Sequence, residues 1–243
     1  MTYVFVGAVG FLIGLASHDL AIQSLGDATP LRPFQGVCRT CLHNRGWLHV
    51  RCQRCGRLVA REVVVAIVSG LVALAFLHTL GWGWLLVPYL MFLLLTMALV
   101  MTDLESFRIV DRLNLRGTAG LFVLLTLATA AVWDWGDLAR GLAGAATYFA
   151  GASLLFILVR GRGFGAGDVK LAVQLGLFTA YLGWSVLGWA VFGTALIGGV
   201  VALILIVGGA ASRKTELPYG PPMILGAWTA IVMVGVGAIP IPS

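Results

Sequence analysis

The sequence predicts an all-α polytopic membrane protein of about eight transmembrane helices. Of its 243 residues, 60% are hydrophobic and 11% are charged, and the mean hydropathy is +0.98. Apolar runs of about 20 residues, enough to cross ~30 Å of hydrocarbon, recur along the whole chain. A soluble domain of this length needs a charged surface, whereas a chain solvated by lipid does not. In lipid these runs form helices, because their backbone groups have no water to bond.

The predicted spans are eight apolar runs. They cover Tyr3 to Ile22, Glu62 to Leu80, Trp82 to Thr102, Leu115 to Trp133, Leu138 to Val159, Asp168 to Ala180, Trp184 to Gly209 and Pro221 to Ile239. The sixth run is short and the sequence does not mark its boundary with the seventh clearly, so the alternative is a protein of seven spans. The chain therefore divides into a first transmembrane helix (1–22), a loop domain (23–61) and a transmembrane domain (62–243).

The basic residues predict the orientation of these spans. Every Lys and Arg except Arg140 falls in loops, or in the span ends beside them, that alternate onto one side of the membrane. By the positive-inside rule that side is cytoplasmic, and both termini lie outside the cytoplasm. The net charge of +6 thus reflects topology. Nucleic-acid binding is not expected, because the charges are spread over four loops.

All four cysteines of the chain lie in the first loop, as two C-x₂-C pairs separated by ten residues: Cys38, Cys41, Cys52 and Cys55. This spacing predicts a structural zinc site, in which four thiolates close a tetrahedron and leave no open position for water. Two disulfides are the rival interpretation, although the reducing cytoplasm disfavours them. The spacing also admits four unconnected thiols, or His43 or His49 in place of one cysteine ligand.

Two aspartates stand out because ionisable residues at membrane depth are costly. Asp103 follows the third apolar run, and Asp168 opens the sixth directly after Gly165-Ala166-Gly167. The topology places both at similar depth on the cytoplasmic side. Two adjacent carboxylates share one proton, so one can activate water while the other polarises a peptide carbonyl. Gly165 and Gly167 would let a substrate strand approach closely.

Simpler explanations exist for each aspartate taken alone. Asp168 could cap its helix, and Asp103 could be a helix-end residue that reaches water. Together they could form a cation or proton pathway in a transporter, which makes a non-enzymatic transporter or an assembly factor the alternative function. A transport path usually needs a polar site near the midplane, and the sequence shows none.

The motifs around both aspartates resemble those of the type IV prepilin peptidases, a family of bacterial membrane proteases. The segment from Gly165 to Leu171 resembles the family's GxGD-x-K-L motif, which includes Lys170. Thr102-Asp103, with Asp111 eight residues on, resembles its first aspartate motif. Pro218-Tyr219-Gly220-Pro221 resembles its late Pro-aromatic-Gly-Pro segment, and the cysteine loop resembles the zinc domain of bifunctional members.

The resemblance implies that Asp103 and Asp168 are catalytic and that the chain removes the basic leader of type IV prepilins or type II secretion pseudopilins at the cytoplasmic face. Lys170 could orient lipid or a carboxylate near the site. An acidic group should receive the basic leader, and Glu105, Asp111 and Glu216 are the candidates.

Many members of this family also N-methylate the new amino terminus with S-adenosylmethionine. In those members the second span usually opens with Arg-Tyr-Pro-Leu-Val-Glu, whereas here Arg61 is followed by Glu62 and three valines. The end of the first span lacks the usual Asn and basic residue, and Val110 replaces a proline. These departures leave the two aspartates intact and leave methylation open.

Overall fold

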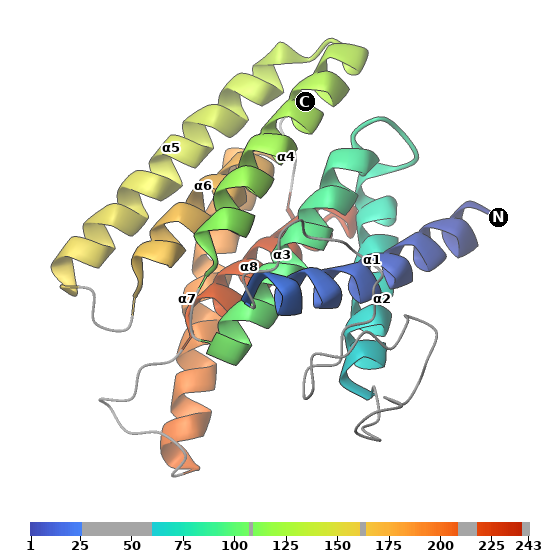
Figure 1. The fold of residues 1–243 in the computed structure, drawn as a ribbon. Coiled ribbons are helices and arrows are strands. Elements are labelled where there is room, and N and C mark those ends of the chain that lie inside the picture. The colour runs from blue at the N-terminus through green and yellow to red at the C-terminus, as the bar shows by residue number, and fades with distance from the viewer. Residues whose placement is uncertain (26–59, 107–108, 161–163, 209–217, 240–243) are drawn as a thin grey trace.

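The computed structural model describes residues 1–25, 60–106, 109–160, 164–208 and 218–239 (Figure 1). Within these ranges the chain is all-helical, as predicted. The helices are α1 (Thr2–Leu25), α2 (Ala60–Leu80), α3 (Leu86–Ser106), α4 (Asp111–Val132), α5 (Trp135–Leu158), α6 (Ala166–Leu182), α7 (Trp184–Val207) and α8 (Gly220–Gly235). Six of them, α1 to α5 and α7, are long and apolar enough to cross a membrane. The chain is therefore a multi-pass membrane protein.

The two remaining helices, α6 and α8, are shorter, with 17 and 16 residues. Most of their side chains are buried by other helices. They therefore form the interior of the bundle, where a full transmembrane length is not required. The eighth helix ends at Gly235 and not at the predicted Ile239. Gly183 alone separates α6 from α7, so the described residues contain two helices where the seven-span alternative expected one.

The helices pack mainly as sequential pairs, α1 with α2, α5 with α6, and α7 with α8 (Figure 1). Small residues allow these close approaches. A methyl group placed on Gly144 of α5 would lie 2.1 Å from the Cβ of Ala180 on α6, and one on Gly176 would lie 2.6 Å from the carbonyl oxygen of Gly144. Helices in lipid associate through close van der Waals packing, because lipid tails are as apolar as the helices and give no hydrophobic driving force between them. Small residues at the contacts permit that close packing.

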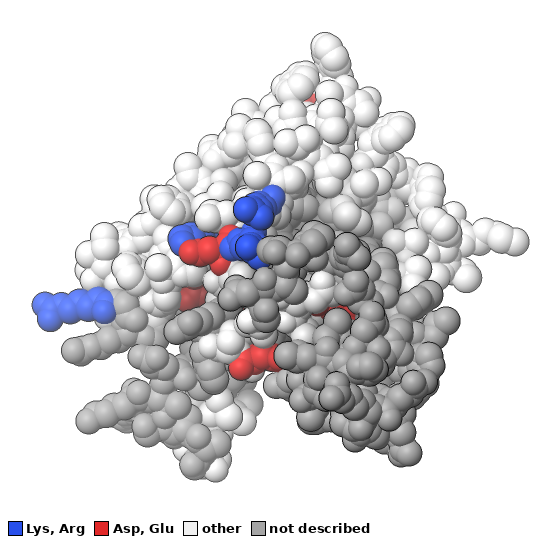
Figure 2. Space-filling model, viewed as in Figure 1, with Lys and Arg blue, Asp and Glu red and all other residues white. Residues whose placement is uncertain are grey.

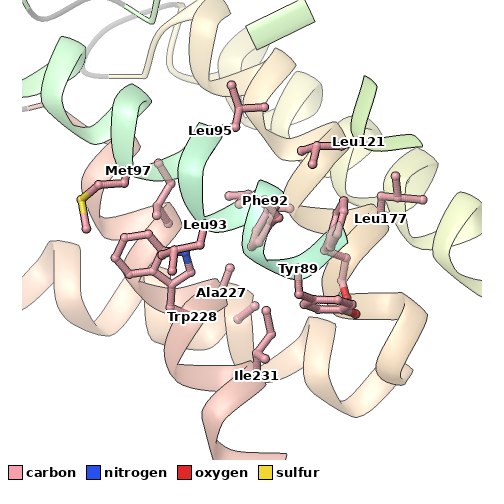
Figure 3. Packing of buried hydrophobic residues seen from close by; sticks show 14 of the residues in the cluster. Tyr89, Phe92, Leu93, Leu95, Met97, Leu121, Leu177, Ala227, Trp228 and Ile231 are labelled. Carbon is pink, nitrogen blue, oxygen red and sulfur yellow. The ribbon is translucent and has the colours of Figure 1, made fainter. Parts of the chain in front are cut away.

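The core lies around α3, which packs against α1, α4 and α8. Figure 3 shows side chains of α3 among those of α4, α6 and α8. Phe92 of α3 stacks on Phe178 of α6 with ring centroids 4.5 Å apart. The hydroxyl of Tyr89 donates to the carbonyl oxygen of Phe178 at 2.7 Å, and the indole N–H of Trp228 donates to Thr96 at 3.2 Å. These contacts fix α3, α6 and α8 relative to one another.

The surface agrees with a lipid environment. In the face drawn in Figure 2, most of the described surface carries no charge. Large apolar side chains such as Leu127, Ile157 and Val207 are exposed. The charged Arg61–Glu105 pair, 3.0 Å apart, instead joins the start of α2 to the end of α3. These charged side chains therefore lie at helix ends, as expected where the helices of a membrane protein reach water.

Candidate active site

Asp103 lies in the last turn of α3 and is only 5% exposed. Its Oδ2 atom accepts a hydrogen bond from the backbone N–H of Gly220, the first residue of α8, at 3.2 Å. Free N–H groups and the helix dipole make a helix N-terminus favourable to negative charge. A methyl group on Gly220 would lie 2.7 Å from that same oxygen, so a glycine is needed for this approach.

Asp168 lies in the first turn of α6 and is 7% exposed. Its Oδ2 atom accepts from the backbone N–H of Gly165 at 2.8 Å, while its own N–H donates to the Gly165 carbonyl at 3.1 Å. These reciprocal bonds are the helix cap that sequence reasoning offered as the simple explanation of Asp168. The cap orients the carboxylate without excluding a chemical role, because the bond occupies one of its two oxygens.

Ile109 links the surroundings of the two aspartates. A methyl group on Gly167 would lie 2.9 Å from the Cβ of Ile109, and one on Gly220 would lie 3.4 Å from its Cδ1. Both glycine backbones therefore pack against one side chain. Gly220 bonds Asp103 and Gly167 precedes Asp168, so the surroundings of both carboxylates meet at Ile109. The structure thus brings the ends of α3, α6 and α8 together with both carboxylates between them, although α4 and α5 separate α3 from α6 in the chain.

Two aromatic rings flank the pair on the α6 side. Phe164 and Tyr219 meet edge to face with ring centroids 5.2 Å apart. Burial raises the pKa of the Tyr219 phenol, and the neighbouring charge of Asp168 raises it further. Tyr219 therefore stays a neutral hydrogen-bonding group beside the carboxylates. Sequence reasoning gave neither ring a role, because their contact joins segments far apart in the chain.

Lys170 pairs with Asp111 at the start of α4, with Nζ 2.6 Å from Oδ2. In the structure Lys170 is therefore paired with a carboxylate, that of Asp111. One turn further into the membrane, the amide of Gln174 donates to Asn114 Oδ1 at 3.0 Å, and both side chains are fully buried. These two polar contacts connect α4 with α6 beside the aspartates. Sequence reasoning did not single out Asn114 or Gln174.

Two of the three acidic residues expected to receive a basic leader are engaged within the chain. Glu105 accepts from Arg61 and Asp111 from Lys170, so a leader would compete with these bonds. Glu216 lies outside the described residues.

The predicted zinc ligands Cys38, Cys41, Cys52 and Cys55 also lie outside the described residues, as do His43 and His49. Among the residues that are described, no three His, Cys, Asp or Glu side chains are grouped so that they could hold a metal ion. The described site therefore consists of carboxylates, backbone N–H groups and aromatic rings.

The helical fold and the two buried aspartates at adjoining helix ends define a polytopic membrane protein with a paired-carboxylate site. The model of the type IV leader peptidase family matches residues 89–207, which include both aspartates. The match covers 119 of the 243 residues, so the chain is similar to this family over about half of its length.

The matched relatives carry one name, prepilin leader peptidase/N-methyltransferase. The Aeromonas hydrophila protein is 30% identical over 194 residues, which cover 76% of this chain and 63% of that protein. The Myxococcus xanthus protein is 26% identical over 237 residues, covering 90% of this chain and 68% of that protein. This chain thus spans somewhat less than two thirds of the Aeromonas relative. No solved structure matches it.

Proposed function

We propose that this chain is an intramembrane aspartyl endopeptidase that removes the leader from type IV prepilins or type II secretion pseudopilins. The observation that carries the proposal is the burial of Asp103 and Asp168 together, each oriented by one backbone N–H group. Two carboxylates in one desolvated site retain a shared proton, which is the state that acid–base hydrolysis of a peptide requires.

In this mechanism Gly220 and Gly165 each hold one carboxylate oxygen, and the other oxygens face a water molecule. As the water oxygen attacks the scissile carbonyl carbon, the ionised carboxylate takes a water proton and the protonated one donates to the carbonyl oxygen. The resulting tetrahedral intermediate breaks its C–N bond while the newly protonated carboxyl gives its proton to the leaving amine. The other carboxylate takes a hydroxyl proton, so the site returns to its one-proton state.

The proposed setting is the inner membrane of a bacterium, with the aspartates and the 26–59 segment on the cytoplasmic side. Support comes from the distribution of basic residues under the positive-inside rule and from the Arg61–Glu105 pair, which places the start of α2, directly after the 26–59 segment, two residues from Asp103 at the end of α3. Membrane lipid surrounds the apolar helices, and nucleic acid is not a partner. Accessibility of single cysteines introduced at 134 and 216 to an impermeant reagent tests the orientation.

We also propose Zn²⁺ as a structural ion of Cys38, Cys41, Cys52 and Cys55, and methylation with S-adenosylmethionine as a second activity. The twin C-x₂-C spacing supports the first, and the relatives' name supports the second. Purified protein should contain about one zinc ion per chain, lost when Cys38 and Cys41 are changed to serine. The mass of the processed amino terminus decides methylation.

The test of the peptidase is co-expression with a prepilin, scored by loss of the leader. Asp103→Asn and Asp168→Asn should insert normally and fail to cleave. Asp134→Asn is the matched control, because Asp134 caps α5 at an exposed site and asparagine caps helices equally well. Normal cleavage by both site variants would instead favour the transporter class.

A further inference from the structure

An apolar groove of about 580 Å³ opens between α5 and α7 and ends beside the aspartates. We name it the α5–α7 groove. Gly151 and Leu155 of α5 line one wall, Gly188 and Val191 of α7 line the other, and Tyr219 lies at one end. No atom lies within 4 Å of the place where a side chain would begin on Gly151 or Gly188. The groove is therefore open at the positions where α5 and α7 carry no side chain.

The position of the groove along α7 shows its direction. Gly198 of α7 faces the ring of Tyr219 and the side chain of Pro222, so it marks the depth of the aspartates. On α7 the groove is lined from Trp184 to Ala195, a distance of about 17 Å at 1.5 Å per residue. It therefore runs from the aspartates toward the opposite end of the bundle.

A second apolar hollow, of about 490 Å³, also borders the site, where Leu104 and Pro221 line it, and it reaches inward to Met97 of α3 and Trp228 of α8. Its α7 wall is Ile197, Val201 and Leu205. Trp228 lies about 12 Å into α8 from Gly220 at 1.5 Å per residue, whereas the α5–α7 groove follows α7 for about 17 Å. The α5–α7 groove therefore leads further toward the opposite end of the bundle and is the better continuation for a chain that enters the membrane from the site.

We propose that the α5–α7 groove holds the apolar helical segment by which a substrate continues from the scissile bond into the bilayer. The inference rests on the proposed peptidase function. A peptide cut at this depth has one flank in hydrocarbon, and that flank must be helical and apolar. Phe164 and Tyr219 line the groove and also flank Asp168 and Gly220, so groove and site are continuous. Glycines at 151 and 188 allow a helix to approach closely.

The experiment fills the groove. In the full-length purified protein, Gly151→Leu and Gly188→Leu, singly and together, place side chains into open space. Gly120→Leu and Gly199→Leu are matched controls, since these helical glycines also have nothing within 4 Å and lie outside the groove. The double groove variant should raise KM for a membrane-anchored prepilin about tenfold with kcat little changed, because only binding is lost. The controls should match the unsubstituted protein.

An unchanged KM in the double groove variant, with normal cleavage by the unsubstituted protein, overturns the inference alone. A fall in kcat with KM unchanged also overturns it, since the filling would then act on the aspartates. Absence of cleavage by the unsubstituted protein removes the proposed function and the inference with it.

Photocrosslinking identifies the occupant directly. A photoreactive residue at Val191, which lines the groove, should crosslink to the apolar segment of the prepilin, and one at Val200, exposed on α7 outside it, should not. Crosslinks from 191 to lipid alone, or to a second copy of this chain, would overturn the inference.

Discussion

The backbone N–H of Gly220 lies 3.2 Å from Asp103 Oδ2, although 117 residues separate them in the chain. This bond places the N-terminus of α8 on a carboxylate at the end of α3. It gives the Pro218-Tyr219-Gly220-Pro221 segment a physical purpose: the glycine admits the carboxylate, and Pro221, at the start of the helix, needs no hydrogen-bond partner.

Gly220→Ala should abolish most cleavage, because its methyl group would lie 2.7 Å from the carboxylate oxygen. A displacement of about 1 Å in a reacting group can cost on the order of a hundredfold in rate. Leader cleavage in membranes measures the effect. Gly120→Ala is the control, since its methyl group meets open space. Full activity of Gly220→Ala would show that the N–H contact does not position Asp103.

Exchanging the two charges of the Lys170–Asp111 pair should partly restore the cleavage rate that either single charge reversal lowers. Both side chains are more than one third exposed, so the pair contributes about 0–1 kcal/mol to stability. Its effect should lie in holding the starts of α4 and α6 beside the aspartates. Lys170→Asp is expected to lower cleavage about tenfold, with recovery in Lys170→Asp/Asp111→Lys. No recovery in a correctly inserted double variant would assign the role to the Lys170 charge itself.

The buried Asn114–Gln174 pair should show strong non-additivity. Asn114 Nδ2 and Gln174 Oε1 have no hydrogen-bond partner among the described residues. Asn114→Leu strips the remaining partner from Gln174 and should cost about 1–3 kcal/mol, whereas the double change to leucine should cost less than either single one. Reversible unfolding in mixed micelles measures this. Additive losses would mean that each amide acts independently.

Arg140 caps the C-terminus of α6 from α5. Its Nε donates to the carbonyl oxygen of Ala180 at 2.8 Å, and its Nη2 donates to that of Tyr181. Arg140→Met should therefore lower the free energy of unfolding by about 1.5–3 kcal/mol, the range for hydrogen bonds to a charged group. Arg116→Met, at an exposed site on α4, should cost little in the same unfolding assay. Equal costs for the two would contradict the cap.

The sequence alone predicts the all-helical membrane fold, because an apolar run of transmembrane length has few other ways to satisfy its backbone. It also singles out Asp103 and Asp168, since charge at membrane depth is rare. It indicates that the sixth apolar run is short, but it does not predict that α6 and α8 lie in the interior of the bundle, because length gives no information on which neighbours cover a helix. The contacts Phe164–Tyr219 and Asn114–Gln174 join distant segments, so no local pattern indicates them.

The central claim is that Asp103 and Asp168 act as one unit, and a kinetic cycle tests it most directly. Cleavage rates of a purified prepilin are compared for the unsubstituted protein, Asp103→Asn, Asp168→Asn and the double variant. Residues of one catalytic unit are grossly non-additive. The account predicts that either single change abolishes cleavage as completely as both together. The contradicting result is a measurable rate in each single variant, with the rate of the double variant lowered by the product of the two single-variant factors.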